Sequence, residues 1–182
     1  MKYTLTRKFF VLLGKEFSIT DEQGVLVGYA KQKAFKLREE LTIFSDREMK
    51  TPLVSMKARN ILDFGATYDV HDEISGQTLG SFRRMGARSL FRDEWRIYAP
   101  NSEEIGIIQE ESKILAFVRR FMTNIIPQNY DLRIGAEDAG GFKQRFNLIK
   151  YVLDFEVNEQ LLNKYLAFAA AVLLGAIEGR QE

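Results

Sequence analysis

Cysteine is absent from the sequence, and proline and histidine are scarce. Without cysteine the chain has no disulfide, no thiolate metal ligand and no cysteine nucleophile, and it suits a reducing compartment. Only three prolines occur, at Pro52, Pro100 and Pro127, and none belongs to a flexible linker that would divide the chain. We therefore expect residues 1–182 to form one domain, which is long enough to bury a substantial core.

An excess of charge of either sign is also missing. The 26 lysines and arginines nearly balance the 25 aspartates and glutamates, which leaves a net charge of +1. This balance excludes the strong positive field with which proteins attract nucleic acids, so no nucleic-acid partner is expected. Any attraction to an anionic surface has to come from a local cluster of basic side chains.

Long hydrophobic runs are lacking too. The apolar run at residues 9–13 is short and has no small-residue cleavage site, so we expect no secretory signal peptide. The longest uncharged run, residues 165–177, would span about 20 Å as a helix. A bilayer core is about 30 Å thick, so we do not expect an integral membrane protein. A cytoplasmic protein, with any membrane contact at the periphery, is the expectation.

The motifs of common catalytic sites are missing as well. No GxSxG elbow is present, and the single histidine, His71, lies in a turn-like segment next to acidic residues. Adjacent carboxylates such as Glu103 and Glu104 point to opposite faces of a strand and cannot converge on one substrate. Phosphate-binding loops and EF-hand spacing are absent. We therefore expect a protein that is not an enzyme and has no cofactor or metal.

The sequence does contain a repeated hairpin pattern. Each unit is a short apolar strand, a turn with Asp or Asn, and a second strand that ends in basic residues. The four units cover residues 16–33, 40–59, 66–84 and 94–111. Within each first strand, apolar residues two apart lie on one face, as in a half-buried β-strand. Turns such as DEQG and DEISG contain the residues that tight hairpin turns favour.

A degenerate fifth unit, NYDLRIGAEDAGGFKQRFNLI, precedes the strand-like segment KYVLDFEV. Apolar segments between the units predict linking strands at residues 34–37, 60–64, 89–91 and 114–121. About a dozen short strands at this regular spacing are typical of a sandwich or a barrel. Of these, a closed antiparallel barrel is our expectation, because a further segment predicts a helix that could fill it.

That helix is predicted at residues 159–178, with Asn158 as its N-cap. Residues 165–177 are apolar on every side, which indicates a helix buried all round. Its length of about 20 Å matches the height of a barrel built from strands of five or six residues. The many alanines keep it thin. A membrane anchor and an oligomer contact remain as alternatives.

Hairpin repeats of this pattern followed by a hydrophobic helix resemble the LURP-one-related and phospholipid-scramblase families, which share the tubby C-terminal fold. The resemblance runs from about Tyr3 to Ile177. It implies a barrel of twelve antiparallel strands around a C-terminal helix. It also implies a binding or signalling role, because tubby-like members bind membrane phosphoinositides. Lipid scrambling has been proposed for scramblases, whose proline-rich leader and cysteine-rich stretch this chain lacks.

The basic residues at the ends of the repeat units form the predicted binding site. Hairpins repeated around a barrel would bring these residues into a ring or patch that suits phosphate head groups. The predicted ligand-binding residues are Lys31, Lys33, Lys57, Arg59, Arg83, Arg84, Arg88, Arg119 and Arg120. The ligand would be an anionic phospholipid, a phosphoinositide head group or another phosphorylated molecule.

Other interpretations of the same pattern remain open. Outward-facing basic residues also protect strand edges and keep a β-protein soluble without binding anything. A protein-interaction or scaffold domain would need no small ligand and would use a strand edge or a loop face. A scramblase-like activity would require the hydrophobic helix to enter the membrane.

Overall fold

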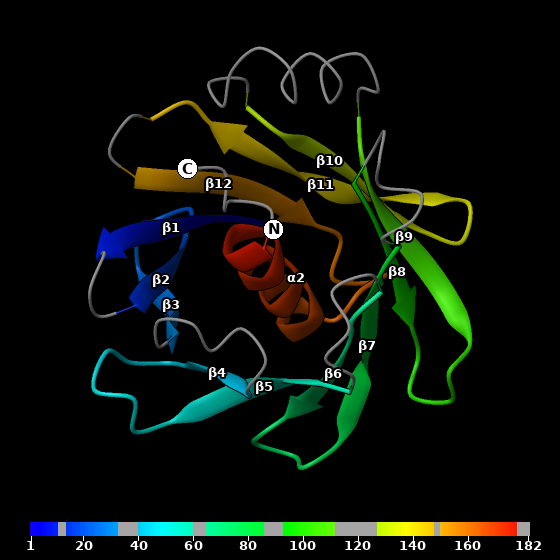
Figure 1. Ribbon diagram of the computed structural model, residues 1–182, viewed down its shortest axis with the longest axis horizontal. Coiled ribbons are helices and arrows are strands. Elements are labelled where there is room, and N and C mark those ends of the chain that lie inside the picture. Colours follow the sequence, from blue (N-terminus) through cyan, green and yellow to red (C-terminus); the bar gives the residue numbers. More distant parts are fainter. Residues whose placement is uncertain are drawn as a thin grey trace.

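The computed structural model describes residues 1–10, 14–32, 40–59, 65–85, 93–111, 127–147 and 150–177. Twelve antiparallel strands close into a barrel around one helix, as predicted (Figure 1). The strands are β1 (Lys2–Phe10), β2 (Gly14–Asp21), β3 (Leu26–Gln32), β4 (Leu41–Phe44), β5 (Pro52–Ala58), β6 (Thr67–Asp72), β7 (Thr78–Arg84), β8 (Glu94–Tyr98), β9 (Glu104–Glu110), β10 (Asn129–Ile134), β11 (Glu137–Arg145) and β12 (Lys150–Val157). The helix, α2, spans Lys164–Ile177.

Each repeat unit is one hairpin of the barrel. The four units form the pairs β2–β3, β4–β5, β6–β7 and β8–β9, and the degenerate unit forms β10–β11. The segment KYVLDFEV is β12, which pairs with β1 and so closes the barrel. The linking strands predicted at residues 34–37, 60–64, 89–91 and 114–121 all lie outside the described residues.

The hairpin turns use the residues that the sequence predicted. In the β2–β3 turn, the Asp21 carboxylate accepts the N–H of Gln23 at 3.0 Å and that of Val25 at 2.9 Å. Gly24 in this turn has φ +80°, a conformation that favours glycine. These local bonds set the turn, so the strands on either side meet in a defined register.

The helix begins later than predicted, at Lys164 instead of residue 159. Asn158 does act as a cap, but of a turn: its side chain accepts the N–H of Gln160 at 3.1 Å. The N-cap of α2 is Asn163, whose side chain accepts the N–H of Tyr165 at 2.8 Å. Two asparagines five residues apart are equally good caps. Only the packing of the intervening turn, where Leu162 is buried, decides between them.

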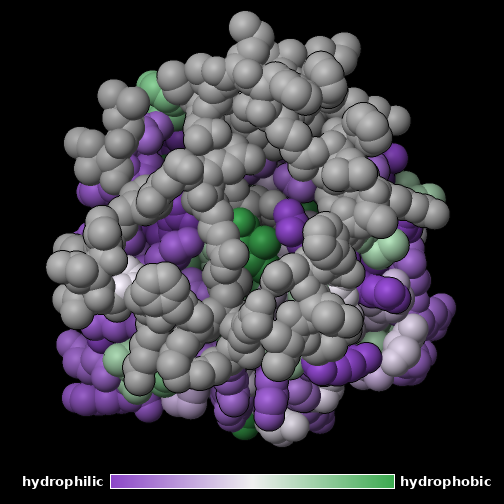
Figure 2. Space-filling view, in the orientation of Figure 1, coloured by the Kyte–Doolittle hydropathy of each residue, from purple (hydrophilic) through white to green (hydrophobic). Residues whose placement is uncertain are grey.

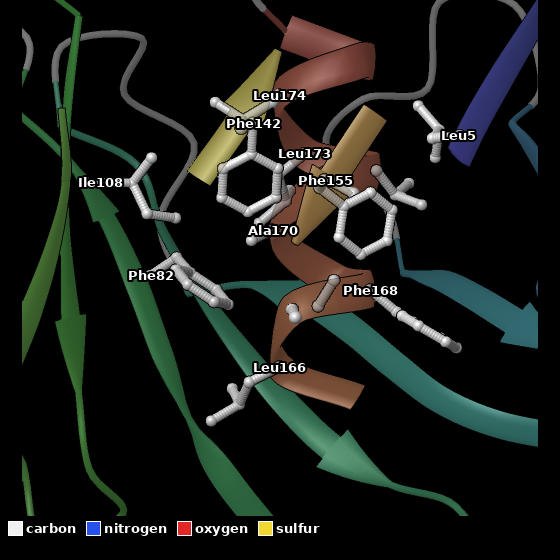
Figure 3. Packing of buried hydrophobic residues seen from close by; sticks show 14 of the residues in the cluster. Leu5, Phe82, Ile108, Phe142, Phe155, Leu166, Phe168, Ala170, Leu173 and Leu174 are labelled. Atoms are coloured by element: carbon white, nitrogen blue, oxygen red, sulfur yellow. The ribbon is translucent and has the colours of Figure 1, made fainter. Parts of the chain in front are cut away.

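The core lies between α2 and the inner face of the barrel. Every residue from Leu166 to Ala176 is buried. Figure 3 shows Phe142 and Phe155 packing beside the helix, with Phe168 projecting from it toward the strands. A Cβ atom at Gly175 would lie 2.9 Å from the Leu5 side chain, so a small residue is required where α2 approaches β1. The buried, small-residue helix predicted from the sequence is confirmed.

Two cations lie at the C-terminal end of α2, where the helix dipole is negative. Arg7, fully buried inside the barrel, donates to the carbonyl oxygen of Gly175 and lies 4.9 Å from the centre of the Tyr151 ring. Lys15 Nζ donates to the carbonyl oxygen of Ala176 at 3.3 Å. Both side chains satisfy carbonyl groups that a helix end leaves without partners.

Candidate functional site

The antiparallel order brings the basic ends of the hairpins to one end of the barrel. The second strand of each hairpin runs in the same direction along the barrel. The C-terminal end of α2 is therefore the end that carries the basic residues of these strands, namely Lys31 on β3, Lys57 and Arg59 at β5, and Arg83 and Arg84 on β7. The other predicted site residues, Lys33, Arg88, Arg119 and Arg120, lie outside the described residues. Figure 2 shows this end of the barrel, with hydrophobic atoms at the centre and hydrophilic residues around the flanks.

Strand register aligns three arginines across the outer face of β5 to β8. Arg59 donates its backbone N–H to Thr67, Thr67 pairs with Arg83, and Arg83 pairs with Arg96. We call Arg59, Arg83 and Arg96 the arginine row. Its three members come from three different hairpin units. Sequence reasoning missed Arg96, because this residue lies in the middle of a strand and not at a basic end.

Two members of the arginine row are held by carboxylates. Arg59 Nε donates to Asp69 at 3.0 Å, and this hydrogen bond raises the pKa of the Arg59 guanidinium. Arg96 Nε donates to Glu94 at 2.8 Å, and its Nη1 donates to Glu104. These contacts fix the positions of two guanidinium groups on the surface.

Arg83 differs from its neighbours in the row. Its side chain is exposed, and it makes no hydrogen bond or ion pair with any described residue. It stands directly opposite Arg96, whose guanidinium is bonded to Glu94 and Glu104, so the N–H donors of Arg83 remain open to a ligand.

The remaining basic residues lie apart from the row. Arg84 follows Arg83 in the sequence but points to the other side of β7, where its guanidinium is 3.6 Å from Asp93. Lys31 is separated from β5 by β4, and its Nζ is 3.4 Å from Glu16. Lys57 is exposed and pairs across the strands with Asp69. Carboxylates therefore separate several of the described basic residues, among which Arg59, Arg83 and Arg96 form a short row.

The described side chains contain no group of three or more His, Asp or Glu residues that could hold a metal ion. His71 lies in the β6–β7 hairpin, where its Nδ1 is 3.1 Å from the Thr78 hydroxyl. Within the same described ranges, no helix has the length and apolarity that crossing a membrane requires.

A closed barrel with an internal helix, built from hairpin repeats, is the architecture that the resemblance implied. A protein-family model described as LURP-one-related matches residues 26–152, which is well over half of the chain. A comparison with curated proteins found no match. On this match and this fold, the chain belongs to the LURP-one-related family, within the tubby-like superfamily.

Proposed function

We propose that this protein is a non-enzymatic binding module that recognises the phosphate of an anionic phospholipid head group through the arginine row. The observation that carries the proposal is Arg83, an exposed guanidinium without a partner among the described residues, opposite a second guanidinium. Membership of the tubby-like superfamily is consistent with a binding domain of this kind.

Arginine is the side chain best suited to this role. Its planar guanidinium carries five N–H donors and binds phosphate oxygens in a bidentate manner. Arg59 donates from Nε and Nη2 to Asp69. The Nη1 group of Arg59 therefore remains available to a ligand that is bound by Arg83. The carboxylates that hold Arg59 and Arg96 reduce the positive potential. We therefore expect binding of modest affinity that weakens as salt increases.

The test is co-sedimentation of the protein with liposomes. Neutral phosphatidylcholine vesicles are compared with vesicles that also contain phosphatidylserine or a phosphoinositide, at low and at physiological salt. We expect binding only to the anionic vesicles and a loss of at least about fivefold in Arg83→Glu, because one phosphate contact becomes repulsive. The matched control is Lys150→Glu, which makes the same charge change at an exposed residue outside the row.

Equal losses in Arg83→Glu and Lys150→Glu would mean that only net charge matters, and would contradict the arginine row. A soluble inositol phosphate added as competitor separates head-group recognition from general surface attraction. Lipid scrambling is not part of the proposal, because α2, which would have to enter the membrane, fills the barrel.

A further inference from the structure

Two cations lie over one aromatic ring on the outside of the barrel. Tyr29 lies in β3 opposite Ser18 of β2, and both side chains face outward, whereas the next residue, Ala30, is buried against the core. The Arg47 guanidinium lies 5.3 Å from the centre of the Tyr29 ring, and the Lys31 ammonium lies 5.7 Å from it. Although Tyr29 points away from the core, it is only 3% exposed, so its neighbours cover the ring.

The β4–β5 turn places Arg47 on this ring. Asp46 accepts the backbone N–H groups of Lys50 and Thr51, each at 3.1 Å, which sets the conformation of the turn. The turn lies at the opposite end of β5 from Arg59, and the seven residues of that strand span about 20 Å. The cluster of Tyr29, Lys31 and Arg47 is therefore separate from the arginine row.

The N–H donors of Arg47 remain open to a ligand. The side chain is exposed and makes no hydrogen bond or ion pair with any described residue. A guanidinium that packs on an aromatic ring is held through its flat face, and this contact does not use its N–H groups. Packing thus positions the group, and its donors face no competing acceptor in the described part of the chain.

Lys31 supplies the second positive charge. The Tyr29 hydroxyl, and after it the Glu16 carboxylate, raise the pKa of the Lys31 ammonium, which therefore stays charged at neutral pH. Its Nζ is 3.4 Å from Glu16, and both side chains of this pair are in contact with solvent. Such an exposed pair is weak, and an ammonium has three donors, so Lys31 can also bind a second anion.

We infer that Arg47 and Lys31 bind a phosphate monoester on a side chain of a partner protein, such as a phosphorylated serine, beside the Tyr29 ring. A phosphate monoester carries about two negative charges at neutral pH, which two cations match, whereas a carboxylate carries one. The planar guanidinium binds two phosphate oxygens at once, and the ammonium adds a point charge.

The charges around the cluster favour a single phosphate group over a membrane. The carboxylates of Glu16, Asp46 and Glu48 lie close to the two cations in the structure or the sequence. They repel an extended anionic surface, while one phosphate on a flexible peptide can contact the cations alone. This site therefore differs from the arginine row in both place and ligand, and the inference does not rest on the proposed lipid binding.

NMR titration of isotope-labelled protein with a blocked Gly-phosphoserine-Gly peptide tests the inference. We expect saturable shifts of the amide signals of β3 and of the β4–β5 turn, with a Kd in the millimolar range, because one phosphate makes few contacts. The unphosphorylated peptide should cause no saturable shift. Equal responses to the two peptides, or no saturable shift with the phosphorylated one, would overturn the inference.

Paired variants locate the site. Arg47→Gln with Lys31→Gln should raise the Kd at least about tenfold, since both charge-assisted contacts are lost. The control is Arg133→Gln with Lys150→Gln, which makes the same charge change at two exposed residues outside the cluster and should change the Kd less than about twofold. Equal weakening in both variants would show that only net charge matters. Far-ultraviolet circular dichroism checks that each variant is folded.

Vesicle co-sedimentation separates this site from the arginine row. Arg47→Gln should bind anionic vesicles as the wild type does, and a loss as large as that of Arg83→Glu would assign the cluster to lipid and overturn the inference. If the wild-type protein binds no vesicles, the proposed function fails, and the peptide titration still decides the present inference.

Discussion

At the scale of single residues, two aspartates stabilise their own hairpin turns by accepting hydrogen bonds from backbone N–H groups of the turn. Asp46 accepts the backbone N–H groups of Lys50 and Thr51, each at 3.1 Å, and these hydrogen bonds lower the pKa of its carboxyl. Asp72 accepts those of Ile74 at 2.8 Å and Ser75 at 3.2 Å, which lowers its pKa in the same way. In each turn the charged form of the side chain is the better acceptor.

These pKa shifts predict how stability depends on pH. A carboxyl with a lower pKa in the folded chain stabilises the fold above its unfolded pKa, here 3.8, and loses this effect as pH falls through the folded pKa. We expect Asp46→Asn with Asp72→Asn to be less stable than wild type in urea at neutral pH, and the difference to shrink at about pH 2.5.

The control for this experiment is Glu48→Gln, an exposed carboxyl in the same turn as Asp46. It should leave the pH dependence of unfolding close to that of the wild type. A stability difference for the aspartate variant that is the same at both pH values would show that the two charges do not matter.

At the scale of elements, α2 supplies the centre of the hydrophobic core inside the barrel. Ala170 is 2% exposed and lies on a helix that the barrel surrounds. We expect Ala170→Asp to lower the free energy of unfolding by at least about 3 kcal/mol, because a carboxylate without a partner would enter the core. Urea unfolding and soluble yield measure the effect.

The control for Ala170→Asp is Lys164→Asp, which places an aspartate in the same helix at an exposed position. Lys164 is the first residue of α2, and an acidic residue there favours the helix dipole. This variant should unfold close to the wild type. Wild-type stability in Ala170→Asp would mean that α2 does not contribute to the core.

The elements themselves could largely be predicted from the sequence, because their signals are local. Apolar residues two apart, such as Phe17 and Ile19, mark one face of a strand, and both are buried in β2. An uncharged run marks a helix buried all round. The start of α2 could not be predicted, since Asn158 and Asn163 are both competent caps and tertiary packing selects the second.

At the scale of the whole molecule, the first and last strands meet. β1 pairs with β12, and α2 contacts strands from both halves of the chain. No part of the barrel therefore has a complete core of its own, and we expect one cooperative unfolding transition. Trp95 is the single tryptophan and is buried next to Tyr68. Its fluorescence and the far-ultraviolet circular dichroism should change at the same urea concentration.

The control variant in that experiment is Trp95→Phe, which removes the single tryptophan and so shows which part of the fluorescence change comes from Trp95. A loss of circular dichroism before the change in Trp95 fluorescence would reveal a part of the barrel that unfolds separately, and would contradict the expectation of one transition.

The candidate sites are also properties of the whole molecule, which is why the sequence predicted them only in part. The basic ends of the hairpins were visible as a pattern. The alignment of Arg59, Arg83 and Arg96 depends on the register of four strands, which turns and bulges set.

The order of the elements has a consequence for synthesis. The helix that fills the barrel comes after all twelve strands, so during translation the strands leave the ribosome before their core exists. At about 5–20 residues per second, roughly 8–30 s pass between the first residue of β1 and the first residue of α2. During that time the growing chain carries apolar strand faces with nothing to cover them. The closed barrel therefore cannot acquire its core until α2 has been synthesised.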